Sequence, residues 1–146
     1  MSQTYARAAQ AYRAAIVSSS SSLHTLLFLY DLMIADLLRA KDARVRGQFD
    51  LCFNALRKAS RIALALPTTL DWRRAGKLAA TLERFYLSLS CRIMRLSRHG
   101  QPLELFDRMV DDLRSVRATW QEVARATSDA ARPSSGAHGR SMRQSG

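Results

Sequence analysis

The sequence has few cysteines, few prolines and no long hydrophobic run, and each shortage excludes a class of protein. Its 146 residues include two cysteines and three prolines. Cys52 and Cys91 both lie inside apolar helical patterns and form no Cys-x-x-Cys pair, so we expect buried, reduced thiols. No stretch approaches the ~18 apolar residues of a membrane span, and the N-terminus lacks the basic and apolar regions of a secretory signal. We therefore expect a cytoplasmic protein of one domain.

The chain also lacks the residue patterns that carry catalysis or hold a cofactor. Its histidines, His24, His99 and His138, are scattered without the spacing of metal ligands. No P-loop, dinucleotide-binding glycine motif, G-x-S-x-G or H-E-x-x-H occurs. The adjacent carboxylates Asp111 and Asp112 would face different directions on a helix. These absences predict no enzyme, no cofactor, no metal and no small-molecule substrate.

What the sequence has in excess is positive charge, with a formal net charge of +11. Of its 23 basic residues, 20 are arginine, which is typical of a GC-rich genome as well as of binding to an acidic partner. Nucleic-acid binding usually pairs a basic groove with stacking aromatics or a recognition helix, and neither pattern is evident. A solvated basic face, an acidic partner and, less favoured, nucleic acid therefore remain open.

Apolar residues recur every three or four positions along most of the chain, and no window alternates as a β-strand does. In one segment they keep a 4-3-4-3 spacing from Val45 and Phe49 to Leu66. His99-Gly100 predicts a helix end, and Pro102 suits the first turn of the next helix. The pattern predicts an all-α antiparallel four-helix bundle with helices over about 23–40, 43–66 and 72–98 and a last one ending near 126.

The two ends of the chain differ from the bundle in composition. Residues 1–22 contain an Ala-rich segment and five consecutive serines, Ser18 to Ser22, which predict a short helical arm and a linker or helix cap. Residues 23–127 would form the bundle. Residues 128–146 have almost no apolar side chain and predict a disordered basic tail.

Several short motifs stand in an order that points to a known family. Tyr12 lies ten residues before a serine helix start at Ser22, and Leu29-Tyr30-Asp31 follows in the first long helix. Further on come Leu70-Asp71, the stretch Ala75-Gly76-Lys77-Leu78-Ala79-Ala80-Thr81-Leu82, the pair Phe85-Tyr86 and a late Trp120. In this order and spacing the chain resembles the flagellin export chaperone (FliS) family over about three quarters of its length. It departs from that pattern at three positions. Ser22 stands where the family has proline, Leu32 where it usually has glycine, and Ala75 where it has glycine.

The resemblance implies a function and a partner. It implies a cytosolic chaperone that binds the C-terminal segment of flagellin, prevents premature polymerisation and delivers the subunit to the flagellar type III export apparatus. The export gate is a further expected partner, and a monomer or weak dimer is the expected state. The residues that the resemblance assigns to client binding are Tyr12, Ile16, Tyr30, Asp31, Gly76, Leu78, Leu82 and Tyr86.

Each of these residues also has a purely structural interpretation. Tyr12 and Ile16 would cap the bundle, and Gly76 would allow close helix packing. Tyr30 would be a core tyrosine, and Asp31 would be a surface or capping carboxylate. The core would also contain Leu78, Leu82 and Tyr86. The alternative function is a basic helical module that binds nucleic acid or an acidic protein. Such a module would lose affinity steeply with salt.

Overall fold

The computed structural model describes residues 20–69 and 78–131, and it contains helices α2 (Ser20–Val45), α3 (Phe49–Ala65), α5 (Leu78–Arg95) and α6 (Glu104–Ala131). A short 3₁₀ helix, η1 (Leu66–Thr69), follows α3. No strand occurs among the described residues. The predicted all-α class is therefore confirmed. Positions 1–19 of the expected arm and linker, most of the tail and positions 72–77 of the predicted helix over 72–98 lie outside the described residues. Ser20 to Ser22, predicted as linker, are the first residues of α2.

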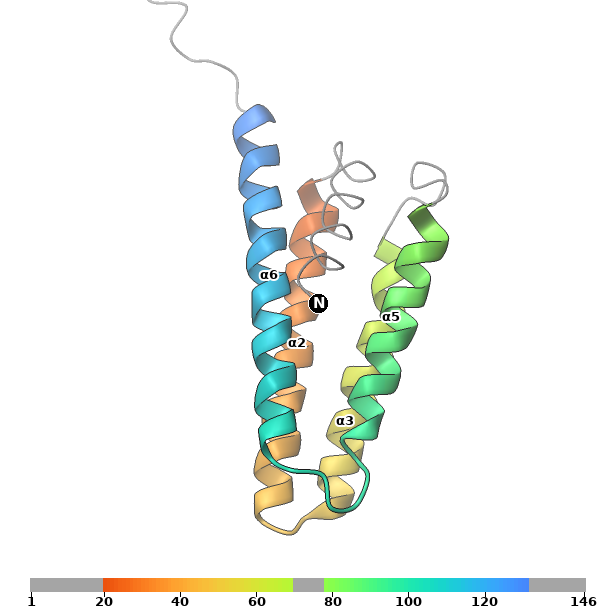
Figure 1. The fold of residues 1–146 in the computed structure, drawn as a ribbon. Coiled ribbons are helices and arrows are strands. Elements are labelled where there is room, and N and C mark those ends of the chain that lie inside the picture. Colours follow the sequence, from red (N-terminus) through yellow and green to blue (C-terminus); the bar gives the residue numbers. More distant parts are fainter. Residues whose placement is uncertain (1–19, 70–77, 132–146) are drawn as a thin grey trace, which may run out of the picture.

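The four helices alternate in direction and form the predicted antiparallel bundle (Figure 1). Helix α2 packs against both α3 and α6, and α3 packs against α5 on its other side. The order across the bundle is therefore α6–α2–α3–α5. Two ion pairs join the N-terminal part of α6 to α2 and α5. Lys41 Nζ of α2 lies 2.6 Å from Asp107 Oδ1, and Arg92 Nη2 of α5 lies 3.2 Å from Asp112 Oδ2.

Large apolar side chains from α2, α5 and α6 fill the core. Trp120, Tyr30, Tyr86 and Phe106 are all fully buried. Helix α3 contributes Leu56 and three smaller side chains, Cys52, Ala59 and Ala63, at the positions that the 4-3-4-3 spacing predicted. Small residues on this helix let the neighbouring helices approach α3 closely, because interior side chains must interdigitate without voids.

The turn between α2 and α3 lies further along the chain than the sequence pattern predicted. Helix α2 continues to Val45 and ends in a Schellman motif, in which Gln48 N–H donates to Ala43 O and Gly47 N–H donates to Arg44 O. Gly47 has a φ of 74°, which glycine adopts without strain. The prediction that Val45 and Phe49 lie in the buried seam is wrong, since they are 62% and 56% exposed.

Three other expectations differ from the structure. Helix α5 ends at Arg95, before Gly100 takes up a φ of 81°, and α6 continues to Ala131 instead of ending near 126. Both cysteines are free, but only Cys52 is buried, so the prediction of a buried thiol is wrong for Cys91. Within the described residues, no helix is long and apolar enough to cross a membrane.

Candidate binding surface

The residues that the sequence singled out are mostly in the interior. Tyr30, Leu82 and Tyr86 are 1% exposed or less, which is the core position that the structural interpretation expected. Tyr12, Ile16 and Gly76 lie outside the described residues, and Leu78 begins α5. The structure thus brings Tyr30, Leu82 and Tyr86 into one core and presents none of the three on the surface.

Tyr30 and Tyr86 connect two helices that are not neighbours in the bundle order. Their hydroxyl oxygens are 3.5 Å apart in the buried interior, so one phenol hydrogen-bonds the other across the bundle from α2 to α5. A buried hydroxyl needs such a partner, because an unmade hydrogen bond costs about 1–3 kcal/mol. This pair therefore positions α5 relative to α2, and α5 carries part of the surface described below.

Asp31 lies on the surface and pairs with α6. Its two carboxylate oxygens accept from Arg117, with Nε 2.5 Å from Oδ1 and Nη2 3.1 Å from Oδ2. A bidentate arginine–carboxylate pair fixes both side chains in one geometry. Because both are partly exposed, the pair contributes ~1 kcal/mol or less to the free energy of unfolding. Asp31 acts in this structure as a clamp between α2 and α6.

Helix α3 carries a second apolar stripe beside its buried seam. Phe49, Phe53 and Leu64 are all about half exposed. Their spacing of four and eleven residues places them on the same side of the helix as Ser60, which lies seven residues after Phe53. Ser60 is buried and hydrogen-bonds Ser90 of α5. The stripe therefore runs along the edge of α3 that faces α5.

Helix α5 continues this apolar edge across the contact. Leu87 is exposed and Met94 is half-buried, and they lie three residues before and four residues after Ser90, on the same side of α5. The rings of Phe49 and His99 lie 6.4 Å apart, which agrees with the antiparallel register that the Ser60–Ser90 contact sets. We call Phe49, Phe53, Leu64, Leu87 and Met94 the apolar strip.

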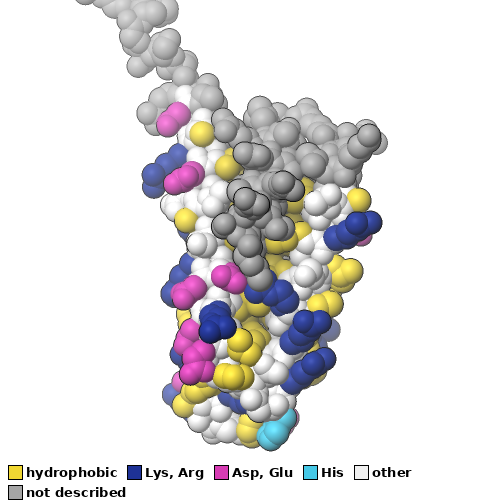
Figure 2. All heavy atoms as spheres, in the orientation of Figure 1, with side chains coloured by type: hydrophobic (Ala, Val, Ile, Leu, Met, Phe, Trp, Pro, Cys, Tyr) yellow, Lys and Arg dark blue, Asp and Glu magenta, His cyan; other side chains and the backbone are white. Residues whose placement is uncertain are grey.

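The surface between α5 and α6 is a second candidate binding surface, but its lining is less apolar. A hollow of about 660 Å³ lies there, and four arginines and two aspartates are among the residues that line it. Figure 2 shows hydrophobic atoms in the seam between α6 and α5 and along the α5 side, with basic side chains among them. Exposed apolar side chains that form a contiguous set on a surface mark a binding site more often than scattered ones do. The apolar strip is therefore the better candidate surface for an apolar partner.

The side chains of the apolar strip suit an apolar segment as a partner. Among the described residues, no group of three or more His, Cys, Asp or Glu side chains could hold a metal ion. An amphipathic helix docks on such a surface through side chains spaced three and four residues apart. Sequence analysis missed Phe53, Leu64 and Leu87. Phe53 and Leu64 each follow a residue of the predicted seam, Cys52 and Ala63, and Leu87 follows Tyr86, which the structure buries.

The comparisons with known proteins give one match. The family model for the flagellar protein FliS matches residues 5–127 of the chain, a span that contains α2, α3, α5 and most of α6. No curated protein and no solved structure matches the chain.

Proposed function

Because the chain belongs to the FliS family of flagellar proteins, and thus to a family of export chaperones, we propose that its client is flagellin. The chain binds the C-terminal segment of newly made flagellin, prevents premature polymerisation and delivers the subunit to the flagellar type III export apparatus. The family match carries the chaperone role. The apolar strip is the observation that supports binding of an apolar helical client.

The physical logic of this function fits the strip. A polymer subunit whose terminal segment is disordered when free and helical when assembled exposes apolar side chains that self-associate. A chaperone that covers those side chains must offer an apolar surface and let the client fold on it. Half-exposed Phe53, Leu64 and Leu87 offer that surface without further unfolding of the bundle.

The remaining expected contacts belong to this proposal as well. The arm residues Tyr12 and Ile16, with Gly76 and Leu78, would touch the client directly. Tyr30, Leu82 and Tyr86 would act by fixing the position of α5, since their side chains are buried. Asp31 would act through its clamp on Arg117. The protein would work in the cytoplasm as a monomer or weak dimer, without catalysis, and would meet the export gate as a second partner.

The experiment is calorimetric titration of the full chain with the C-terminal segment of flagellin from the same genome, at low and high salt. A one-to-one complex that tolerates salt and has a negative heat-capacity change is expected, because apolar burial dominates. An absence of binding at both salt concentrations would overturn the flagellin proposal. Binding that is lost steeply at high salt would favour the alternative of a basic module for nucleic acid or an acidic protein.

A further inference from the structure

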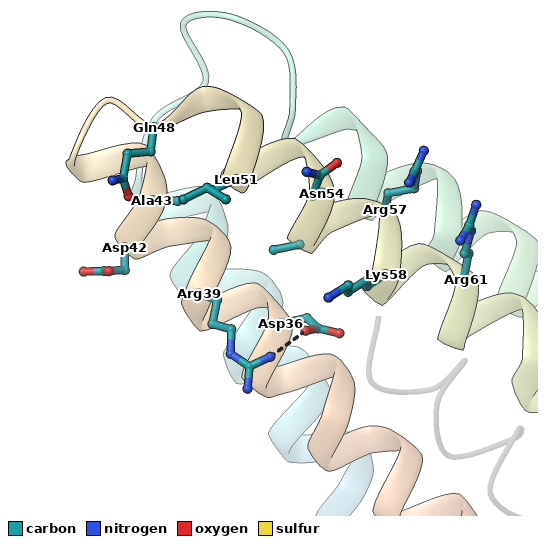
Figure 3. A pocket seen from close by; sticks show the side chains of 11 residues that line it. Asp36, Arg39, Asp42, Ala43, Gln48, Leu51, Asn54, Arg57, Lys58 and Arg61 are labelled. Carbon is teal, nitrogen blue, oxygen red and sulfur yellow. Dashed lines mark hydrogen bonds and ion pairs between the residues drawn. The ribbon is translucent and has the colours of Figure 1, made fainter.

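A groove runs between α2 and α3 (Figure 3). Its volume is about 560 Å³, and residues of α2, of the turn and of α3 line it. Volumes of this size are typical of pockets that accommodate a ligand or several side chains of a partner.

The groove has an apolar part that a purely ionic ligand would leave unused. Ala43 and Ala55 are buried at its base, and Leu51 lines it with 55% of its surface exposed. Burial of a leucine against a partner is favourable by about 1.5–3 kcal/mol when the whole side chain is covered. An occupant with its own apolar side chains would therefore gain from this base.

Positive charge surrounds the apolar base. Arg57, Lys58 and Arg61 of α3 line the groove, together with Arg39 of α2. Figure 3 shows Arg57 and Arg61 extending toward the same side of α3, one helical turn apart, and Lys58 extending toward α2. One turn of α-helix rises about 5.4 Å, so Lys58 and Arg61, three residues apart, match two carboxylates that are about one turn apart on another helix.

Three of these cations form no close ion pair within the described part of the chain, although Lys58 is near enough to Asp36 to lower the pKa of that carboxyl. Arg57, Lys58 and Arg61 form no ion pair within 4.0 Å there. Lys41, Arg46 and Arg117, by contrast, each pair with an aspartate. The unpaired cations concentrate positive potential on one side of α3, and potential of this kind steers and orients an acidic partner.

Asp36 gives the groove a further feature. Its carboxylate is nearly buried beside the groove, and Oδ1 accepts from Arg39 Nη1 at 3.3 Å. The carboxylate holds this guanidinium at the groove edge. Asp42 of α2 also lines the groove, so the carboxylates of an acidic partner have to meet the cations of α3 and not the α2 side. No aromatic side chain that could stack on a base lines the groove.

We propose that the α2–α3 groove is a second interaction surface, which binds an acidic amphipathic helix of a partner protein. Apolar side chains of that helix pack on Leu51 and Ala55, and its carboxylates, one turn apart, meet Lys58 and Arg61. The base of the groove, with Ala55 and Lys58, faces α2, whereas the apolar strip lies toward α5, so the chain can hold a client and this partner at the same time. The proposal goes beyond flagellin binding and does not require it.

The experiment uses the full chain and a labelled helical peptide of about five turns, with leucines on one face and glutamates one turn apart beside them, measured by fluorescence anisotropy. Two other peptides serve as controls: a scrambled sequence of the same composition, and the same helix with lysine in place of glutamate. Binding of the first peptide alone, weaker at high salt because ions screen exposed charges, is the expected result. Equal binding of the scrambled peptide would overturn the proposal.

Two double variants locate the site. Lys58→Glu/Arg61→Glu reverses charge in the groove, and Arg114→Glu/Arg125→Glu makes the same change in net charge at exposed positions of α6. We expect the groove variant to lose at least about tenfold in affinity, since each lost ion pair contributes up to ~1 kcal/mol and the reversed charges repel. The α6 variant should retain its affinity. An equal loss in both variants would show that net charge alone is responsible and would overturn the proposal.

A variant of the apolar strip tests whether this site is separate from the client surface. Leu64→Ala/Leu87→Ala changes the apolar strip, and it should leave binding of the acidic peptide unchanged. Loss of the acidic peptide in this variant, or tighter binding of duplex DNA or anionic vesicles than of the peptide, would also overturn the assignment. Since flagellin is absent from these titrations, their failure leaves the proposed chaperone function untouched.

Discussion

Removal of two leucines from the apolar strip should weaken client binding by an amount that the structure allows us to calculate. Leu64 is 49% exposed and Leu87 is 54% exposed. Complete burial of a leucine contributes about 1.5–3 kcal/mol, so the half that remains open on each side chain can contribute ~1 kcal/mol when a client covers it. Leu64→Ala/Leu87→Ala should therefore cost ~2 kcal/mol of binding free energy, a Kd about 30-fold higher.

The assay is calorimetric titration with the C-terminal flagellin segment, after circular dichroism has shown that each variant is folded. Leu32→Ala/Leu38→Ala is the matched control, because these leucines of α2 are 38% and 43% exposed and lie outside the apolar strip. Thermal unfolding should change little in either variant, since substitutions at exposed positions are usually within about 0.5 kcal/mol. An unchanged Kd for the strip variant, or an equal loss in the control, would refute the assignment of the strip.

Three other experiments, two substitutions and one chemical labelling, test the fold. Gly47→Ala should lower the free energy of unfolding by ~1 kcal/mol in urea denaturation, because the residue has a φ of 74° although nothing lies near its added Cβ. Burial raises the pKa of Asp36 more than Arg39 and Lys58 lower it. Its protonated form therefore stabilises the folded state fully below 3.8, and this contribution is lost as pH rises through the raised pKa. Asp36→Asn should accordingly raise Tm at neutral pH and flatten the pH dependence of Tm, and a lower Tm would contradict this reasoning. A thiol reagent should label exposed Cys91 quickly and Cys52, whose pKa burial raises, only after unfolding.

The bundle could be predicted from the sequence because burial on helices leaves a periodic signal. Leu56, Ala59 and Ala63 follow the 4-3-4-3 spacing and are all fully buried. The same signal ran on through Phe49 and Val45, where it gave the wrong result. The glycine that ends α2 was visible at position 47, but the apolar spacing across it suggested one continuous helix.

The binding surfaces were harder to predict, because periodicity identifies residues that point inward and says nothing about how two helices are aligned. Phe53 and Leu87 form one strip only because Ser60 hydrogen-bonds Ser90 and so sets the register of α3 against α5. A shift of one helical turn would separate them by about 5.4 Å. The sequence motifs therefore favoured Tyr30 and Tyr86, which are buried, over the exposed residues beside them.

The position of the charges on α3 also bears on whether the arginine-rich composition has a function. A GC-rich genome would account for the number of arginines, but it would distribute them over the exposed positions of every helix alike. On α3 the edge toward α5 carries Phe53 and Leu64, whereas Lys58 and Arg61 line the groove toward α2. This separation gives one helix an apolar edge and a basic edge, and a partner that needs both would have to wrap around α3. Two partners of different chemistry, one on each edge, satisfy the same arrangement without that constraint.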